Sequence, residues 1–169
     1  LLDDLATPLV SEDGLSGAPR AGFAETTPET PGVLIYTSGT PRGPPGALHG
    51  HRVLTGHLPG VSLSHNRLGQ PGDCLWTPAD WAWIGGLFDV LMPGLALGIP
   101  VVAARMEKFS PDHCIRIVRE GAVRNVFFPS TALRMLKAAD VSLPGLRSVA
   151  SGGEPRRAEM LAWGRRAFG

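Results

Sequence analysis

Val33-Leu34-Ile35-Tyr36-Thr37-Ser38-Gly39-Thr40 is the stretch from which the fold can be worked out, because an apolar run passes directly into hydroxyl-bearing residues and glycine. Residues 33–36 predict a short buried strand. The following Pro-Arg-Gly-Pro-Pro-Gly, residues 41–46, predicts a loop, since proline lacks a backbone donor and glycine weakens regular structure. A glycine- and hydroxyl-rich loop after a strand can surround phosphate groups with N–H and O–H donors. An ordinary surface loop is the alternative interpretation.

Strand and helix patterns alternate along the rest of the chain. Further strands are predicted at 74–77, 99–103, 123–128 and 146–150. Helices are predicted over about 50–57 and 81–98, from Ser110 and Ser130 as capping residues to about 120 and 139, and from Pro155 to about 167. This alternation predicts an α/β fold, a mainly parallel sheet with helices on both faces. Residues 1–31 are expected to form a loosely structured lead-in, and residues 32–169 to belong to one domain.

The loops at 37–46, 77–86, 129–131 and 151–155 all follow predicted strands, so we expect them to share the edge where ligands bind in such sheets. Trp81 and Trp83, beside Gly85-Gly86, are suited to the wall of an apolar pocket, although they would serve equally as core residues. In Ser151-Gly152-Gly153-Glu154-Pro155, the glycines allow a planar ring to approach the backbone. Glu154 would also be favoured there by the helix dipole alone.

Composition excludes several classes of function. The chain has 169 residues, of which 43% are hydrophobic and 18% charged, and a formal net charge of +1, so nothing favours nucleic acid as a partner. Glycines and prolines interrupt the apolar run 81–104, which argues against a membrane span. The two cysteines, Cys74 and Cys114, are isolated in the sequence, which favours reduced thiols and a cytoplasmic location. The spacing of the histidines predicts no metal site; these are His49, His51, His57 and His65. We expect both chain ends to be cuts within a longer protein.

Three motifs carry a family resemblance. Residues 36–46 resemble the phosphate-binding signature Tyr-Thr-Ser-Gly-Thr-Thr-Gly-x-Pro-Lys-Gly of the adenylate-forming (AMP-binding) acyl-CoA synthetase superfamily. Residues 77–86 resemble the segment that lines the acyl pocket of acetyl- and medium-chain acyl-CoA synthetases. Gly153-Glu154-Pro155 resembles the superfamily's adenine-contacting element. The chain therefore looks like a fragment of the large N-terminal domain of such an enzyme.

The resemblance implies an ATP-dependent, AMP-forming carboxylic acid–CoA ligase. In that family a carboxylate attacks the α-phosphate of magnesium-bound ATP, giving an acyl-adenylate and pyrophosphate, and the thiol of CoA then displaces AMP. The implied partners are thus a small carboxylic acid, ATP or AMP, magnesium and CoA, together with the remainder of the N-terminal domain and a C-terminal domain. No catalytic residue or metal ligand is assigned within this chain, and the isolated chain is expected to be inactive.

The site residues implied by the resemblance fall into three groups. They are Thr37, Ser38, Gly39, Thr40 and Arg42 for the phosphates of ATP; Gly153, Glu154 and Pro155 for adenine; and Trp83, Ile84, Gly85 and Gly152 for the acyl pocket. Gly85 and Gly152 are small where acetate-specific relatives carry bulkier residues, which predicts an acid longer than acetate.

The phosphate loop departs from the family pattern in its second half. Pro41-Arg42 stand where the family has Thr-Gly, and Pro45 stands where it has lysine. Two alternatives to a CoA ligase follow: a non-catalytic truncated or frame-damaged remnant, and an adenylation domain that loads a carrier protein.

The altered loop predicts weak binding of magnesium-ATP. Losing one charge-assisted contact to a phosphate costs about 1.5–3 kcal/mol of binding free energy, and Arg42 is not equivalent to a lysine at the position of Pro45. Rewriting residues 41–45 as Thr-Gly-Pro-Pro-Lys in the full-length protein should tighten binding by about tenfold or more. Calorimetric titration of both versions with magnesium-ATP measures this, and equal affinities would contradict it.

Overall fold

The centre of the fold is a parallel sheet of three short strands, β3 (Leu75–Trp76), β4 (Asn125–Phe127) and β5 (Ser148–Ala150), in the order β3-β4-β5. The computed structural model describes residues 22–36, 46–104, 106–153 and 158–169. In the register, Val126 pairs with Trp76 on one side and with Val149 on the other. The predicted strand 99–103 contributes only one parallel bridge, from Val101 to Leu75, and Pro100 within it has no N–H to extend the ladder.

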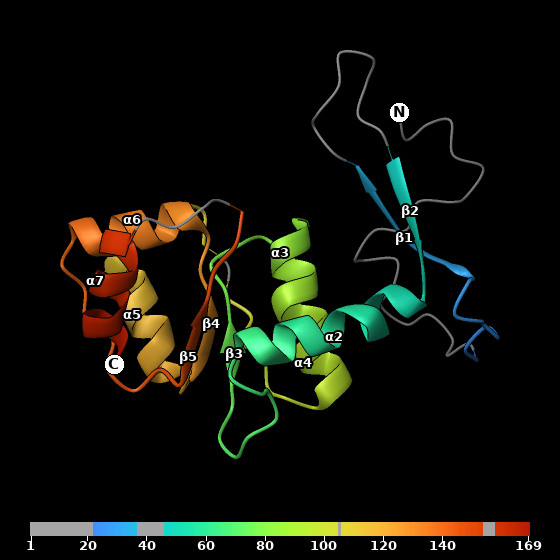
Figure 1. Cartoon of the computed structure of the whole chain (residues 1–169), viewed down its shortest axis with the longest axis horizontal. Helices are drawn as coiled ribbons and strands as arrows, with labels where there is room; N and C mark the ends of the chain where they lie inside the picture. Colours follow the sequence, from blue (N-terminus) through green and yellow to red (C-terminus); the bar gives the residue numbers. More distant parts are fainter. Residues whose placement is uncertain (1–21, 37–45, 105, 154–157) are drawn as a thin grey trace, which may run out of the picture.

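Helices cover both faces of this sheet, as predicted (Figure 1). One face carries α5 (Pro111–Glu120), α6 (Ser130–Ala138) and α7 (Ala158–Phe168). The other carries α2 (Arg52–Ser64) and a continuous helix 84–97, composed of α3 (Ile84–Gly86), a π-helical turn (Leu87–Leu91) and α4 (Met92–Leu97). The α/β fold class is therefore confirmed. No helix among the described ranges has the length and apolar character needed to cross a membrane.

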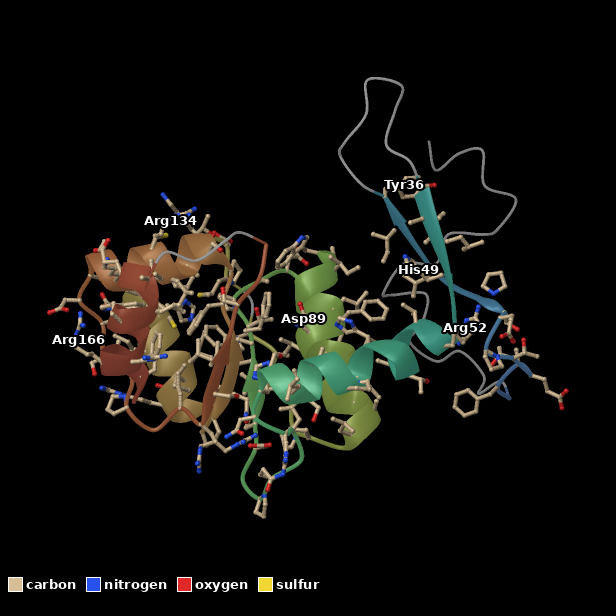
Figure 2. The ribbon with its side chains drawn as sticks, in the orientation of Figure 1. Tyr36, His49, Arg52, Asp89, Arg134 and Arg166 are labelled. Atoms are coloured by element: carbon tan, nitrogen blue, oxygen red, sulfur yellow. The ribbon has the colours of Figure 1, made fainter. Side chains whose placement is uncertain are left out.

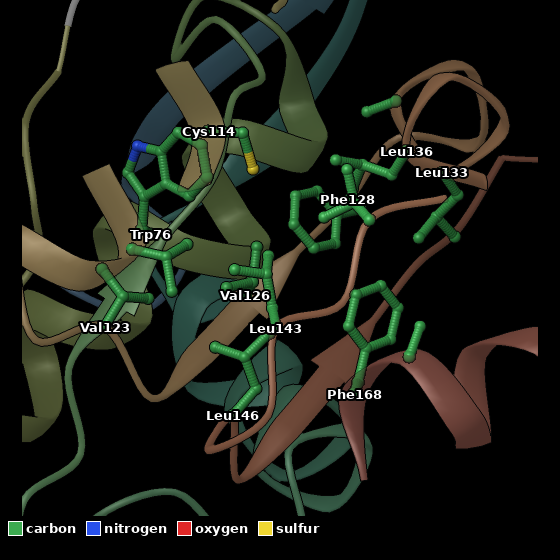
Figure 3. Packing of buried hydrophobic residues seen from close by; sticks show 14 of the residues in the cluster. Trp76, Cys114, Val123, Val126, Phe128, Leu133, Leu136, Leu143, Leu146 and Phe168 are labelled. Carbon is green, nitrogen blue, oxygen red and sulfur yellow. The ribbon is translucent and has the colours of Figure 1, made fainter. Parts of the chain in front are cut away.

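Alternation of side chains along the strands divides the core between the two faces. Val126 and Phe128 join the larger cluster, which packs against α5, α6 and α7 (Figure 3). Phe127 joins a smaller cluster with Leu75 and Val90 on the side of helix 84–97. Because strand side chains point alternately to opposite faces, a strand covered on both sides must be apolar at successive positions. This explains the uninterrupted apolar pattern of β4.

The predicted strand 33–36 lies outside the parallel sheet, which corrects the expectation that it would be a buried strand of that sheet. It belongs to β1 (Pro31–Tyr36), which pairs antiparallel with β2 (Gly46–Gly50), a strand that was not predicted. The resulting two-stranded sheet stands apart from the three-stranded one (Figure 1). Leu34 is 50% exposed and Tyr36 62% exposed. An apolar run indicates a strand, but it does not specify the strand's partner.

Helix boundaries agree with the prediction in some places and differ in others. Ser110 caps α5 as predicted, with its Oγ accepting from the backbone N–H of His113 at 3.5 Å. Ser130 is the first residue of α6 rather than its cap, which is Pro129. Helix α2 continues through Pro59 instead of ending there, and its buried residue Val61 lies beyond the proline. Tertiary burial thus offsets the hydrogen bond that Pro59 cannot make. Pro155, the predicted start of the last helix, lies outside the described residues.

An ion pair joins the segment between α2 and β3 to the start of β5. The Arg147 guanidinium donates to both carboxylate oxygens of Asp73, at 2.6 Å from Nε and 2.9 Å from Nη2. Nη1 donates to the backbone carbonyl of Asn66, and Nη2 also donates to the carbonyls of His65 and Arg67. Burial alone would raise the pKa of Asp73, but the hydrogen bonds from Arg147 and from the N–H groups of Gln70 and Gly69 outweigh it and hold that pKa below its ordinary value. Asp73 is therefore ionised in this arrangement.

His65 lies fully buried beside the ion pair. Its Nδ1 is 2.9 Å from Ser148 Oγ, and its Nε2 has no hydrogen-bond partner in the part of the chain that the structure describes. Burial, reinforced by the positive charge of Arg147 and opposed by Asp73, lowers the pKa of His65 to about 4. The imidazole is therefore neutral in the folded protein at physiological pH.

This buried histidine predicts a loss of stability in mild acid. The unfolded chain binds a proton at His65 below about pH 6.5, whereas the folded chain does so only below about pH 4. The free energy of unfolding should therefore fall as the pH is lowered through this interval, by up to about 3 kcal/mol. Urea unfolding between pH 7.5 and 4 measures the fall. The variant His65→Asn should show a flatter profile, and an unchanged profile would contradict the assignment to His65.

Candidate functional site

The carboxyl ends of β3, β4 and β5 meet at one edge of the sheet because the three strands are parallel. The segment 77–83 follows β3, residues 128–130 follow β4, and residues 151–153 follow β5. Three of the four loops that the sequence places at one edge therefore do lie there. The fourth, 37–46, follows β1 in the separate two-stranded sheet, and its residues 37–45 lie outside the described residues.

Side-chain hydroxyls hold these loops to one another. Ser130 Oγ donates to the carbonyl of Gly152 at 3.4 Å, and Ser151 Oγ donates to the carbonyl of Phe128. Within the loop after β3, Thr77 Oγ1 accepts from the N–H of Ala79 at 3.0 Å. The loops after β4 and β5 are thus fixed to each other by two reciprocal bonds, which gives the edge a defined shape.

Phe127 connects the two parts of the predicted acyl pocket. The Trp83 ring lies against it with centroids 5.9 Å apart and planes inclined by 44°. A Cβ at Gly152 would be 3.8 Å from the Phe127 ring. Trp83 and Gly152, far apart in the sequence, are therefore brought to the same aromatic side chain. Phe127 was not predicted as a site residue, because Phe127 and Phe128 are adjacent aromatics and the sequence does not say which of them faces the site.

The space beside Gly85 is occupied by the Trp83 indole. A Cβ at Gly85 would lie 2.3 Å from Cζ3 of Trp83, closer than any real contact. In this conformation Gly85 makes room for the tryptophan. The assignment of Gly85 to the acyl pocket stays a prediction. Ile84 is 44% exposed. Neither Ile84 nor Gly85 lines a described cavity.

Most of the predicted nucleotide-binding residues cannot be placed. Thr37, Ser38, Gly39, Thr40, Arg42, Glu154 and Pro155 lie outside the described residues. Gly153 is described and has φ +94°, a backbone conformation that favours glycine. The assignment of these residues to phosphates and adenine therefore stays a prediction.

A cavity of about 700 Å³ runs along the outer edge of β5. Its walls are β5 with the loop after it, including Gly152, then Phe127, and residues of α2 and α7. No described strand pairs with this edge of β5. Of the four residues predicted for the acyl pocket, only Gly152 lines the cavity.

A hydrogen-bonded polar pair, His57 and Asp89, also lines the cavity and was not predicted. His57 Nε2 on α2 lies 2.9 Å from Asp89 Oδ1 in helix 84–97, and both residues line the cavity. The His57 ring meets the ring of Phe88 edge-on, with centroids 6.0 Å apart. The sequence does carry one signal: Asp89 is the only charged residue between Trp81 and Ala104.

Other reactive side chains do not form a site. Among the described residues, no three His, Cys, Asp or Glu side chains come together as metal ligands. Cys74 and Cys114 are free thiols, and burial raises the pKa of Cys114 to about 12. Cys114 is therefore a core residue without thiolate character.

The family model described as "AMP-binding enzyme" matches residues 3–169. Acetyl-coenzyme A synthetase 2 from Debaryomyces hansenii is 31% identical over 156 residues, which cover 85% of this chain and 22% of that protein. The crystal structure of an acyl-CoA synthetase from Brucella canis superimposes with a TM-score of 0.80 at 23% identity, covering 96% of this chain and 31% of that one. The o-succinylbenzoate coenzyme A synthetase of Bacillus subtilis, solved with ATP and magnesium ion, gives a TM-score of 0.77 at 21% identity, covering 93% of this chain and 33% of that one. The chain thus spans about a fifth of the curated relative's length and about a third of each solved structure.

The packing of Trp83 on Gly85 can be tested by substitution. Gly85→Ala should displace the indole from Phe127 and lower the free energy of unfolding by about 1–3 kcal/mol, because the new methyl group overlaps the ring. The same change in a Trp83→Ala background should cost much less, so the double-mutant cycle should show strong coupling. Gly152→Ala is the matched control, since its methyl group would stand at an ordinary contact distance. Equal costs of Gly85→Ala in both backgrounds would contradict the packing.

Proposed function

The chain belongs to the AMP-binding enzyme family, and on that premise we propose that it forms part of the N-terminal domain of an AMP-forming carboxylic acid–CoA ligase. The substrate carboxylate attacks the α-phosphate of ATP, forming the acyl-adenylate and releasing pyrophosphate. The thiol sulfur of CoA then attacks the acyl carbon, and AMP leaves as the thioester forms. Residues 3–169 match the family model, and this match is the observation that carries the proposal.

Three observations support this proposal. The relative from Debaryomyces hansenii, which is 31% identical, is an acetyl-coenzyme A synthetase. Its reaction class is the one that we propose for this chain. A solved protein of the same fold binds ATP and magnesium ion. The loops at the carboxyl edge of the sheet supply the type of site that such ligands use, since parallel sheets bind their ligands outside these ends.

Each part of the proposed site has a separate task. Residues 37–42 hold the phosphates of magnesium-ATP, and the segment 153–155 meets the adenine. Gly152, beside Phe127 and the cavity along β5, borders the acid. Such a site acts by positioning the reactants and by stabilising charge as it develops on the phosphate oxygens.

The small size of Gly152 is consistent with an acid longer than acetate. Gly152 adds no side chain at the point where the cavity approaches Phe127. We therefore assign the acid specificity to Gly152, whereas Gly85 accommodates the Trp83 ring in this conformation.

The experiment uses the full-length protein that contains this chain. Incubation with ATP, magnesium, CoA and acetate, butyrate or hexanoate should release pyrophosphate and AMP in an acid-dependent manner, and mass spectrometry should detect the acyl-CoA. The value of kcat/KM should be higher for butyrate or hexanoate than for acetate. Replacing CoA by an acyl carrier protein distinguishes a CoA ligase from a domain that loads a carrier. Absence of acid-dependent pyrophosphate release would contradict the proposed function.

Gly152→Val probes the acid site directly. The added side chain should lower kcat/KM for hexanoate more than for acetate, because it fills the space beside Phe127. Gly56→Val is the control, since Gly56 is exposed on α2 and a Cβ there meets nothing within 4 Å. A parallel loss for both acids would place Gly152 outside the acyl site.

A further inference from the structure

Two serine hydroxyls join the loop after β4 to the loop after β5, at the edge of the sheet that we assign to the substrates. Ser130 Oγ donates to the carbonyl of Gly152 at 3.4 Å, and Ser151 Oγ donates to the carbonyl of Phe128. Among the described residues, the last backbone hydrogen bond between these two segments runs from the N–H of Phe128 to the carbonyl of Ala150, at 2.9 Å. The two hydroxyls therefore continue the connection between β4 and β5 beyond the end of the backbone ladder.

Ser130 does not use its hydroxyl to cap its own helix. It is the first residue of α6, whose cap is Pro129, and the start of this helix has no side-chain cap. A serine hydroxyl near a helix start often accepts from the N–H groups of the first turn. Here the hydroxyl donates to a residue 22 positions further along the chain. The bond therefore stabilises the contact between the two loops rather than the helix.

The bond to Gly152 sets the direction of the peptide that follows it. A trans peptide holds its C=O and the next N–H on opposite sides, so a carbonyl directed at Ser130 turns the N–H of Gly153 away from α6. Gly153 is exposed, and its N–H donates to no backbone carbonyl in the described part of the chain. Its φ of +94° favours glycine and turns the chain at this point. Ser130 thereby determines which way the backbone of residues 152–153 faces.

The two hydroxyl bonds lie between neighbouring strands and not at the open edge of the sheet. The order β3-β4-β5 places β4 in the middle, with β5 beside it. A further strand contributed by the full-length protein would pair with the outer edge of β5, whereas both serine hydroxyls bond on its inner side, toward β4. The contact between the two loops is therefore compatible with a larger sheet.

We propose that Ser130 and Ser151 are positioning residues for the adenylation reaction, and that they act together by holding the backbone of residues 152–153 in the orientation that receives the acid and the adenine of ATP. This inference rests on the proposed function and adds to it two residues that contact neither substrate. Adenine and the tail of the acid do not react. Displacing the loop that meets them should therefore weaken the binding of both substrates more than it slows the chemical step.

The test measures pyrophosphate release by the full-length protein that contains this chain, with ATP and the best of acetate, butyrate and hexanoate varied in turn. Ser130→Ala should raise KM for both substrates by about 3- to 10-fold, as expected for one lost hydrogen bond, with kcat changed by less than about twofold. Ser130→Thr, which keeps the hydroxyl, should retain both KM values. Ser151→Ala should behave like Ser130→Ala. The double variant should raise KM by less than the product of the single effects, because the two bonds hold the same loop.

Ser142→Ala is the matched control. Ser142 Oγ donates to the carbonyl of Ala167 at 3.3 Å, a bond of the same kind and of similar length. Ser142 precedes β5, so it lies at the amino ends of the strands, away from the substrate loops. Ala167 is near the end of α7, next to Arg166, whose side chain points outward in Figure 2. This variant should lower thermal stability about as much as Ser130→Ala and leave both KM values unchanged.

Several outcomes would overturn the inference while the ligase function stands. One is a loss of thermal stability in Ser130→Ala with unchanged KM, which would show a structural bond only. Equal increases in KM for Ser130→Ala and Ser142→Ala, or for Ser130→Ala and Ser130→Thr, would do the same, as would a double variant equal to the product of the single effects. If Ser130→Ala does not fold, Ser151→Ala carries the same comparison. If the unmodified protein releases no pyrophosphate with any of the acids, the inference and the proposed function are both overturned.

Discussion

The buried ion pair between Arg147 and Asp73 is the interaction on which the arrangement of the other elements depends. The two side chains are 16% and 2% exposed, and the guanidinium also bonds the backbone of residues 65–67. A buried charge is tolerated only when it is paired and fully hydrogen-bonded, so removing either partner would leave the other at a cost of several kcal/mol. The pair thereby fixes the chain between α2 and β3 against the start of β5. This contact places α2, and with it His57, beside the cavity.

The requirement that a parallel sheet be covered on both faces then determines where the site lies. Val126 and Phe128 pack in the cluster under α5, α6 and α7. Because side chains alternate along a strand, Phe127 points to the opposite face of the sheet. There it meets Trp83 and borders Gly152. The same side chain thus completes the smaller core and forms part of the candidate acid site. Core packing and ligand recognition are not separate in this part of the molecule, and a substitution at Phe127 would affect both.

Helix 84–97 is an apolar helix in which small residues and one acidic side chain are accommodated by particular contacts. Its glycines lie close to other groups: a Cβ at Gly85 would overlap Trp83, and one at Gly86 would stand 2.4 Å from the carbonyl oxygen of Asp80. Small residues at these points let the loop after β3 fold back onto the helix. The single acidic side chain of the helix, Asp89, is hydrogen-bonded to His57.

The sequence by itself determined the α/β class, the approximate positions of β3, β4, β5, α5 and α6, and the family, because alternating apolar patterns and motif residues are local properties of the chain. Only the tertiary structure decided which strands pair and which side chains contact one another. Residues 33–36 pair with β2 in a separate sheet, α2 continues through Pro59, and Gly85 is filled by Trp83. Phe127, His57 and Asp89 could not be predicted as neighbours, since their contacts join residues separated by tens of positions along the chain. Such contacts depend on how helices pack on the sheet, and local sequence patterns carry no information about that packing.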